Sequence, residues 1–258
     1  TLPGEQAQVD WASFGSITIR GAKRKLSCFV MVLSHSRAMY ARFFLDQTMP
    51  SFLRGHVLGF EALGGAPREI LYDNLKSAVL ERVDSHIRFH PALLELAGHY
   101  HYLPKPCAPY RGNEKGRVER QIQYLRHAFF AARPFADLDD LNAQLARWIE
   151  QIAHERVAPE DAQGRTVKTR WEQERPQLLP LPKNPHPCAL VRATSAAKTP
   201  YLRFDDNDYS IPAELVGVPL TLLADEACVR VIHEEREVAR HVRSYGRKER
   251  IEDRAHLA

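Results

Sequence analysis

The sequence predicts an α/β domain with a mixed sheet flanked by helices, followed by a small all-β domain. Three observations lead to this prediction. Closely spaced strand-like segments between residues 6 and 45 suggest an antiparallel meander. Segments with helical and strand-like spacing then alternate up to about residue 154, an order typical of a layered domain with parallel strands. Short strand-like pieces separated by turn residues follow residue 200 and indicate a small β-barrel.

The first predicted strand covers residues 6–11. Polar and apolar residues alternate along it, so Gln6, Gln8 and Asp10 share one face. A turn is expected at residues 14–16, where a glycine lies between Phe14 and Ser16. The almost unbroken apolar run at residues 26–34 predicts a central strand that is covered on both faces.

The predicted helices follow from apolar residues that recur at helical spacing. They cover residues 50–63, 91–97, 114–131 and 138–154. Short strands are expected between them, at residues 69–72 and near 100–103. Gly64 and Gly65 end the first helix in the usual C-terminal manner, and Asn113 can cap the third.

Prolines divide the chain into two predicted domains. Residues 176–200 are expected to form a semi-rigid extended linker, because Pro176, Pro180, Pro182, Pro185 and Pro187 fall within the first part of it. The sequence therefore predicts that the α/β domain covers residues 1–175 and that the small β-barrel covers residues 201–258.

Composition narrows the classes of protein. The formal charge of +4 is too small to prove a nucleic-acid partner, so the placement of charges matters more. The longest apolar run, near residues 28–33, is far shorter than the ~20 residues of a membrane span. Four scattered cysteines without a CxxC pair predict free thiols in a reducing compartment. No signal peptide is visible, and the start at Thr1 suggests a fragment of a longer protein.

Three carboxylates are the candidate catalytic and metal-binding residues. Asp10 lies at the end of the first predicted strand, Asp73 follows the strand at 69–72, and Glu119 flanks the apolar stripe of the third helix. Ligands gather beyond the carboxyl ends of strands in open α/β sheets. Carboxylate oxygens suit Mg²⁺ or Mn²⁺ rather than zinc, and two such ions promote phosphodiester chemistry. The alternative interpretation is that each acid is a cap, a turn residue or a surface residue.

The segments QVDW, LYDN and PYRGNEKGRVER resemble the acidic-triad segments of DDE transposases and retroviral integrases, whose catalytic domains are RNase H-like. The resemblance implies that Asp10, Asp73 and Glu119 are the first, second and third acids. Glu114 lies five residues before Glu119, but the VER context favours Glu119.

Two other acids compete for the second position of the triad. They are Asp46 and Asp84, and neither ends a buried strand followed by asparagine. Asp73 therefore remains the second acid that the resemblance implies.

Within this superfamily, the segments VDW, LSHSR, YDNLKSAV, KGRVER, YSIP and HVRSYGR are most similar to the IstA-type bacterial insertion-sequence transposases. That resemblance implies an IstB-type AAA+ ATPase helper, DNA partners (transposon ends and target) and self-association to a dimer or tetramer on DNA. It also implies a bacterial cytoplasmic, nucleoid-associated protein with an N-terminal helix-turn-helix region, which is not present before Thr1.

The implied activity is cleavage at a transposon end to leave a 3′-OH, followed by direct attack of that 3′-OH on target DNA. Asp10 would bridge two Mg²⁺ or Mn²⁺ ions, while Asp73 and Glu119 would each help to hold one. The alternatives are an RNase H-like nuclease without strand transfer and a non-catalytic transposase-derived DNA-binding protein.

Basic residues around the third acid are the candidate DNA contacts, since they can neutralise phosphates. They are Lys105, Arg111, Lys115, Arg117, Arg120 and Arg126. The alternative is a solvated helix face. The C-terminal end is also basic, but interleaved acids leave DNA binding, self-association and a plain surface open.

Two further kinds of site are not supported by the residue pattern. His99, His101 and Cys107, and the pair His186 and Cys188, lack standard zinc spacing. The chain contains neither GxxxxGKS nor GxGxxG, which predicts no nucleotide binding by this chain.

Overall fold

The computed structural model describes residues 1–72, 79–83, 86–107, 112–159 and 161–256. They form two compact units. The first contains residues 1–15 and 26–186, and the second contains residues 16–25 and 187–258.

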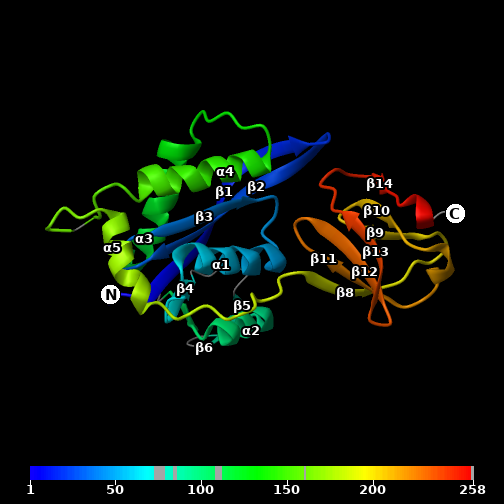
Figure 1. The fold of residues 1–258 in the computed structure, drawn as a ribbon, viewed down its shortest axis with the longest axis horizontal. Helices are drawn as coiled ribbons and strands as arrows, with labels where there is room; N and C mark the ends of the chain where they lie inside the picture. The colour runs from blue at the N-terminus through cyan, green and yellow to red at the C-terminus, as the bar shows by residue number, and fades with distance from the viewer. Residues whose placement is uncertain (73–78, 84–85, 108–111, 160, 257–258) are drawn as a thin grey trace. The chain divides into compact units, whose positions relative to one another are not determined.

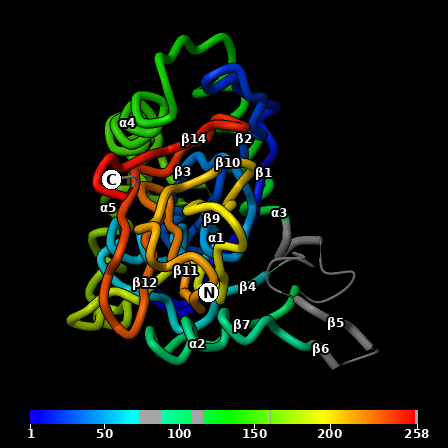
Figure 2. Tube along the Cα trace, turned by 90° about the vertical axis from the view of Figure 1, so that its right-hand side faces the viewer, coloured from blue at the N-terminus to red at the C-terminus, as the bar shows by residue number. Residues whose placement is uncertain are grey.

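The first unit is built on a five-stranded mixed sheet with the order β3-β2-β1-β4-β7 (Figure 1). Its strands are β1 (Gln6–Ile19), β2 (Ala22–Leu33), β3 (Met39–Phe44), β4 (Glu69–Tyr72) and β7 (Leu103–Pro106). β2 and β3 are antiparallel, whereas β4 runs parallel to both β1 and β7. Figure 2 shows the traces of β4 and β7, which lie side by side. The predicted mixed sheet, with its meander and its parallel strands, is therefore confirmed.

The turn predicted at residues 14–16 is wrong, because β1 continues through these residues to Ile19. Phe14 is buried and packs edge-to-face against Phe43 and Phe130, which holds this part of the strand in place. The chain reverses instead at Arg20 and Gly21, whose φ values of 47° and 74° are typical of a two-residue type I′ hairpin turn. Asp10 thus lies within a long strand and not at its end.

The predicted helices are confirmed, and two of them extend by a π-helical turn. They are α1 (Met49–Leu63), α2 (Pro91–Tyr100), α3 (Gly112–Tyr124, continuing over Leu125–Phe130) and α4 (Leu138–Trp148, continuing over Ile149–Ala153). The strand expected near residues 100–103 begins only at Leu103, because α2 runs to Tyr100 and ends at His101 with φ 60°.

Two elements of the first unit were not predicted. One is the separate hairpin of β5 (Val79–Val83) and β6 (His86–Phe89). The other is α5 (Val167–Glu174), which buries only its two end residues and has no apolar stripe. Helical periodicity could not reveal a helix that buries so little of one face.

Helices cover both faces of the sheet. On one face, Trp11 of β1 packs against Phe29 of β2, Phe44 of β3 and Phe52 of α1. On the other face, Phe43 contacts the rings that follow α3. The backbone groups of Phe43 on the edge strand β3 also have hydrogen-bond partners. The side chain of buried Asn142 in α4 accepts the N–H of Phe43 and donates to its carbonyl. β1 is therefore held between two packed layers.

We predict that Gly55→Ala destabilises the first unit by about 1–3 kcal/mol. A Cβ at this position would lie 2.6 Å from Cγ of Phe29, so α1 and β2 would have to separate. The matched control is Gly98→Ala in α2, where a Cβ meets no atom within 4 Å and helix propensity favours alanine. Urea unfolding of the two variants measures the difference, and equal stability of both would contradict the close approach.

Residues that follow α5 also contact the first unit. Leu179 pairs with Ala66 through two backbone hydrogen bonds, and the carbonyl of Asn184 contacts Nε2 of His99. Fully buried Glu174 accepts the backbone N–H groups of Gly4 and Ser36. Leu179 and Asn184 therefore hold the stretch from 176 to 186 to other parts of the first unit.

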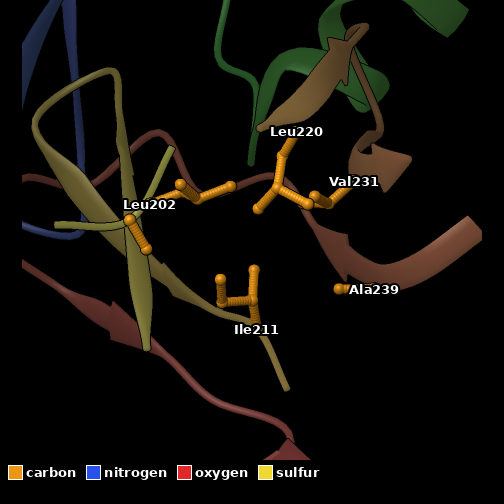
Figure 3. Packing of buried hydrophobic residues seen from close by; sticks show 6 residues of the cluster. Leu202, Ile211, Leu220, Val231 and Ala239 are labelled. Atoms are coloured by element: carbon orange, nitrogen blue, oxygen red, sulfur yellow. The ribbon is translucent and has the colours of Figure 1, made fainter. Parts of the chain in front are cut away.

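The second unit is all-β, as predicted, and its strands form two sheets. β9 (Tyr201–Phe204), β10 (Asn207–Ser210) and β14 (Arg250–Ile251) make one sheet. β8 (Leu190–Thr194), β11 (Leu220–Ala224), β12 (Cys228–His233) and β13 (Arg236–Val242) make the other. β8 falls within the range expected to be linker, because its five residues pair with β11. Figure 3 shows Leu202 and Ile211 facing Leu220, Val231 and Ala239 in the shared core.

The tip of the β1–β2 hairpin belongs to this second unit. Arg24 donates to the carbonyls of Tyr245 and Gly246 at 2.7 and 2.9 Å and pairs with Asp205 at 2.9 Å. Only 12% of its side chain is exposed, so these contacts hold the tip against the C-terminal strands. Nothing in the local sequence predicts this contact, because its partners lie about 180 to 220 residues away in the chain.

Candidate active site

Asp10 and Glu119 line one cavity of about 640 Å³ between β1 and α3. Arg120 and Arg126 of the same helical segment also line it, as do Trp11 and the residues that follow it on β1. The structure therefore brings together two of the three predicted acids and two of the predicted basic residues.

The packing of β1 positions Asp10. Its neighbour Trp11 is buried among three phenylalanine rings, which fixes the backbone at this point. The backbone N–H of Trp11 donates to Oδ1 of Asp10 at 2.7 Å, and the Asp10 side chain is half-buried. The carboxylate is thus oriented by the chain and still reaches the cavity.

The apolar stripe of α3 positions Glu119. Val118 and Ile122 are buried against the sheet, so the intervening Glu119 is exposed at the cavity. The backbone N–H of Val118 donates to Oε1 of Gln8 at 3.2 Å, and Gln8 is only 2% exposed. Gln8 therefore ties β1, two residues before Asp10, to α3, one residue before Glu119.

Sequence reasoning placed Gln8 on the same face as Asp10 but assigned it no role. The sequence offered little signal, because a glutamine on the polar face of an alternating strand is expected to face solvent, whereas Gln8 is only 2% exposed. A side-chain amide requires a hydrogen-bond partner when it is buried. The partner lies on a helix more than a hundred residues later, and periodicity alone does not identify it.

The basic residues predicted to contact DNA lie in several separate places in the structure. Arg126 donates to the carbonyl of Ser13 at 2.6 Å, and its guanidinium lies 4.6 Å from the ring centre of Phe14. Lys105 of β7 forms an ion pair with Glu69 of β4. Arg117 lines a separate cavity. Arg111 lies outside the described residues, and the side chain of Lys115 is not described.

Asp73 and its competitor Asp84 also lie outside the described residues. The other competitor, Asp46, accepts hydrogen bonds from Thr48 and Ser51 at the start of α1, so it has a structural role there. Across the ranges that the structure describes, no three His, Cys, Asp or Glu side chains form a metal-binding group. Carboxylate oxygens such as those of Asp10 and Glu119 are hard donors, the kind of ligand that Mg²⁺ prefers.

A buried chain of hydrogen bonds supports the end of β4. Nδ1 of His56 lies 2.7 Å from the carbonyl of Phe52 and therefore donates to it, so Nε2 accepts from the Tyr72 hydroxyl at 2.9 Å. Tyr102 in turn donates to the Tyr72 hydroxyl at 3.0 Å. Burial lowers the pKa of His56 to about 4 and raises the pKa values of both tyrosines. The three side chains are thus neutral and hold α1, β4 and the start of β7 together.

Many basic residues of the second unit pair within it. Arg240 bonds Glu237 in two places, and Arg243 pairs with Asp205 while stacking on Phe204 and Tyr245. These arginines therefore stabilise the fold of the second unit.

Among the described residues, no helix is long and apolar enough to span a membrane.

Strand order and site together define the class of this domain. A sheet of three antiparallel strands followed by two parallel ones, with a carboxylate on its central strand and another on a covering helix, is an RNase H-like α/β domain.

Comparisons with known proteins find similarity to transposases. Residues 181–253 match the model of the Mu transposase C-terminal domain. The chain is 38% identical over 181 residues to the putative transposase for insertion sequence element IS5376 of Geobacillus stearothermophilus, covering 70% of this chain and 45% of that protein. It is 31% identical to the transposase for insertion sequence element IS21 of Pseudomonas aeruginosa, covering 93% of this chain and 62% of that protein.

Among solved structures, the HTLV-2 integrase catalytic core domain in complex with magnesium aligns with a TM-score of 0.47 and 17% identity, covering 66% of this chain and 97% of that one. The chain spans about half the length of the curated relatives it matches. The family-model match and the insertion-sequence relatives support its place in the DDE transposase/integrase superfamily.

Proposed function

We propose that the protein is the catalytic part of an insertion-sequence transposase that cuts transposon ends and joins the new 3′ ends to target DNA. The observation that carries this proposal is the convergence of Asp10 and Glu119 on one cavity with Arg120 and Arg126. Acidic ligands for a cation beside guanidinium groups for phosphates are the components that phosphodiester chemistry requires. The relatives named as insertion-sequence transposases support the same proposal.

Asp73 is proposed as the second acid of the triad, together with Asp10 and Glu119. In the described part of the sheet, Val9 of β1 pairs with Tyr72 of β4, and the two strands are parallel. These are the residues that immediately precede Asp10 and Asp73 in the sequence. This register supports a role for Asp73 beside Asp10.

The proposed metal ligands are the carboxylates of Asp10, Asp73 and Glu119, which would hold two Mg²⁺ or Mn²⁺ ions. Such ions, when bound, stabilise the charge that develops on a phosphate during displacement. The chain itself orients Asp10 through the N–H of Trp11 and holds Glu119 at the cavity through Gln8. Arg120 and Arg126 would bind the phosphates that flank the bond to be cut.

The proposed partners are transposon-end and target DNA, further copies of the protein in a dimer or tetramer, and an IstB-type AAA+ ATPase. The relatives' names support DNA as the substrate class. The helper and the assembly are implied by the family resemblance.

A labelled transposon-end duplex incubated with the protein, a target plasmid and Mg²⁺ tests the proposal. We expect cleaved ends with a free 3′-OH and a joined product that contains labelled DNA in the plasmid. Cleavage without joining would instead identify a nuclease. DNA binding with neither product in Mg²⁺ or Mn²⁺ would identify a non-catalytic DNA-binding protein.

We predict that Gln8→Met lowers the rate of cleavage by about 10–100-fold and leaves DNA affinity unchanged. Methionine has a similar volume but accepts no strong hydrogen bond, so the N–H of Val118 loses its partner and α3 can shift against β1. Single-turnover cleavage and DNA binding are compared with those of Gln6→Met, which lies on the same strand and bonds Ser34 instead. Equal rates for the two variants would show that Gln8 does not position the acids.

A further inference from the structure

A second, smaller cavity lies beside the turn between β2 and β3. Its volume is about 170 Å³, and its lining includes His35 and Arg37 of the turn, Arg117 of α3 and Arg170 of α5. Three guanidinium groups from separate elements thus surround a single cavity. All three arginine side chains are half-buried, so solvent screens their charges less than it would at an open surface.

We propose that this cavity binds a phosphate group of the DNA backbone outside the reaction centre. The inference rests on the proposed function, because it takes the substrate to be DNA. It adds Arg37 and Arg170 to the DNA contacts that the sequence predicts, and it assigns Arg117 to this second site.

Two carboxylates of the described residues near the cavity already have hydrogen-bond or ion-pair partners. Asp161 pairs with Arg165 at 2.9 Å, while its distance to Nε of Arg170 is 3.6 Å. That Nε atom is buried and has no hydrogen-bond partner within the described part of the chain. The carboxylate of Glu174 accepts two backbone N–H groups, one of them from the residue before Arg37. Among the described residues, three arginines therefore line the cavity, while the carboxylates of Asp161 and Glu174 are bound to other groups.

The chemistry of the lining favours phosphate. Planar guanidinium groups bind phosphate oxygens through paired N–H donors, and several arginines can share one tetrahedral group. The hydroxyl of Ser34 also lines the cavity, but it donates to Oε1 of Gln6 at 3.1 Å, so the guanidinium groups supply the donors. Since a water molecule occupies about 30 Å³ in the liquid, the cavity has room for one phosphate group and a few waters.

The helix α3 connects this cavity to the candidate active site. Arg117 and Glu119 are two residues apart, so at 3.6 residues per turn they point to nearly opposite sides of the helix. One lines the small cavity and the other lines the large one. A phosphate held by Arg117 would therefore fix the DNA against the helix that carries the third acid.

The test measures the affinity of the protein for a fluorescent DNA duplex at several KCl concentrations, in EDTA so that no cleavage occurs. Arg37→Gln, Arg170→Gln and the double variant are compared with Arg54→Gln, which alters an exposed arginine of α1. We expect the double variant to bind about tenfold more weakly and the slope of log K against log salt to fall by about 1. Arg37→Lys keeps the charge, so it should retain the slope while losing affinity.

Melting temperatures identify any variant that fails to fold, and Arg37→Lys then provides the comparison. Wild-type affinity and slope in a folded double variant would overturn the inference and leave the proposed function standing. Weakened binding of inorganic phosphate alone, with unchanged DNA binding, would also overturn it. If the wild-type protein neither binds nor cuts DNA, the proposed function itself fails.

Discussion

Asp10→Asn is expected to lower the rate of DNA cleavage and joining by about 10³-fold or more. Asparagine keeps the shape of the side chain, and its Oδ1 can still accept the N–H of Trp11. What it removes is the negative charge, and a neutral amide binds a divalent ion far more weakly than a carboxylate does. The fold should therefore survive while the chemistry is lost.

Glu119→Gln should have a similar effect, because both acids line the same cavity. The matched control is Glu114→Gln, which removes one carboxylate from the start of the same helix. Single-turnover assays in Mg²⁺ and Mn²⁺, with DNA binding and melting temperature measured in parallel, separate chemistry from folding. Activity within tenfold of wild type in either triad variant, or equal losses in the control, would remove these acids from the mechanism.

Much of the first unit follows from local patterns in the sequence. The apolar run at residues 26–34 predicts the central strand β2, and the stripe that includes Val118 and Ile122 predicts α3. Periodicity identifies such elements because each must bury a continuous face against its neighbours. The position of Glu119 beside that stripe also predicts which way its carboxylate points.

Other features depend on contacts between distant residues, and no local pattern carries them. Gly15 reads as a turn, yet the strand continues because Phe14 is held by rings from β3 and the segment after α3. An arginine near the tip of a hairpin is expected to be exposed, yet Arg24 is held by the carbonyl of Tyr245 and by the carboxylate of Asp205. The same holds for Gln8, whose role depends on a hydrogen bond to α3. Tertiary contacts thus override the local signals at each of these positions.

Two buried histidines are expected to make the first unit sensitive to mild acid. Burial lowers the pKa values of both His56 and His154 to about 4. Nε2 of His56 accepts from Tyr72, and Nε2 of His154 lies 3.1 Å from both the backbone nitrogen and the carbonyl oxygen of Met39. With pKa values near 4, both rings are neutral in the folded state at pH 7. Their ordinary pKa near 6.5 applies in the unfolded chain. The unfolded state therefore binds more protons between pH 6.5 and pH 4.

It follows that stability is lost as the pH falls from 6.5 toward 4, by about 3 kcal/mol for each histidine over the whole window. Urea unfolding from pH 7 to pH 4.5 can be followed by tryptophan fluorescence, since Trp11, Trp148 and Trp171 all lie in the first unit. His154→Gln should flatten the pH dependence, because glutamine does not titrate and its amide can still bond the backbone of Met39. The exposed His127→Gln serves as the control. If the stability of His154→Gln depends on pH as strongly as that of the wild type, burial does not hold this ring neutral. Carboxylates titrate mainly below pH 5, so a weaker pH dependence of the variant between pH 5 and 6.5 reports the contribution of His154.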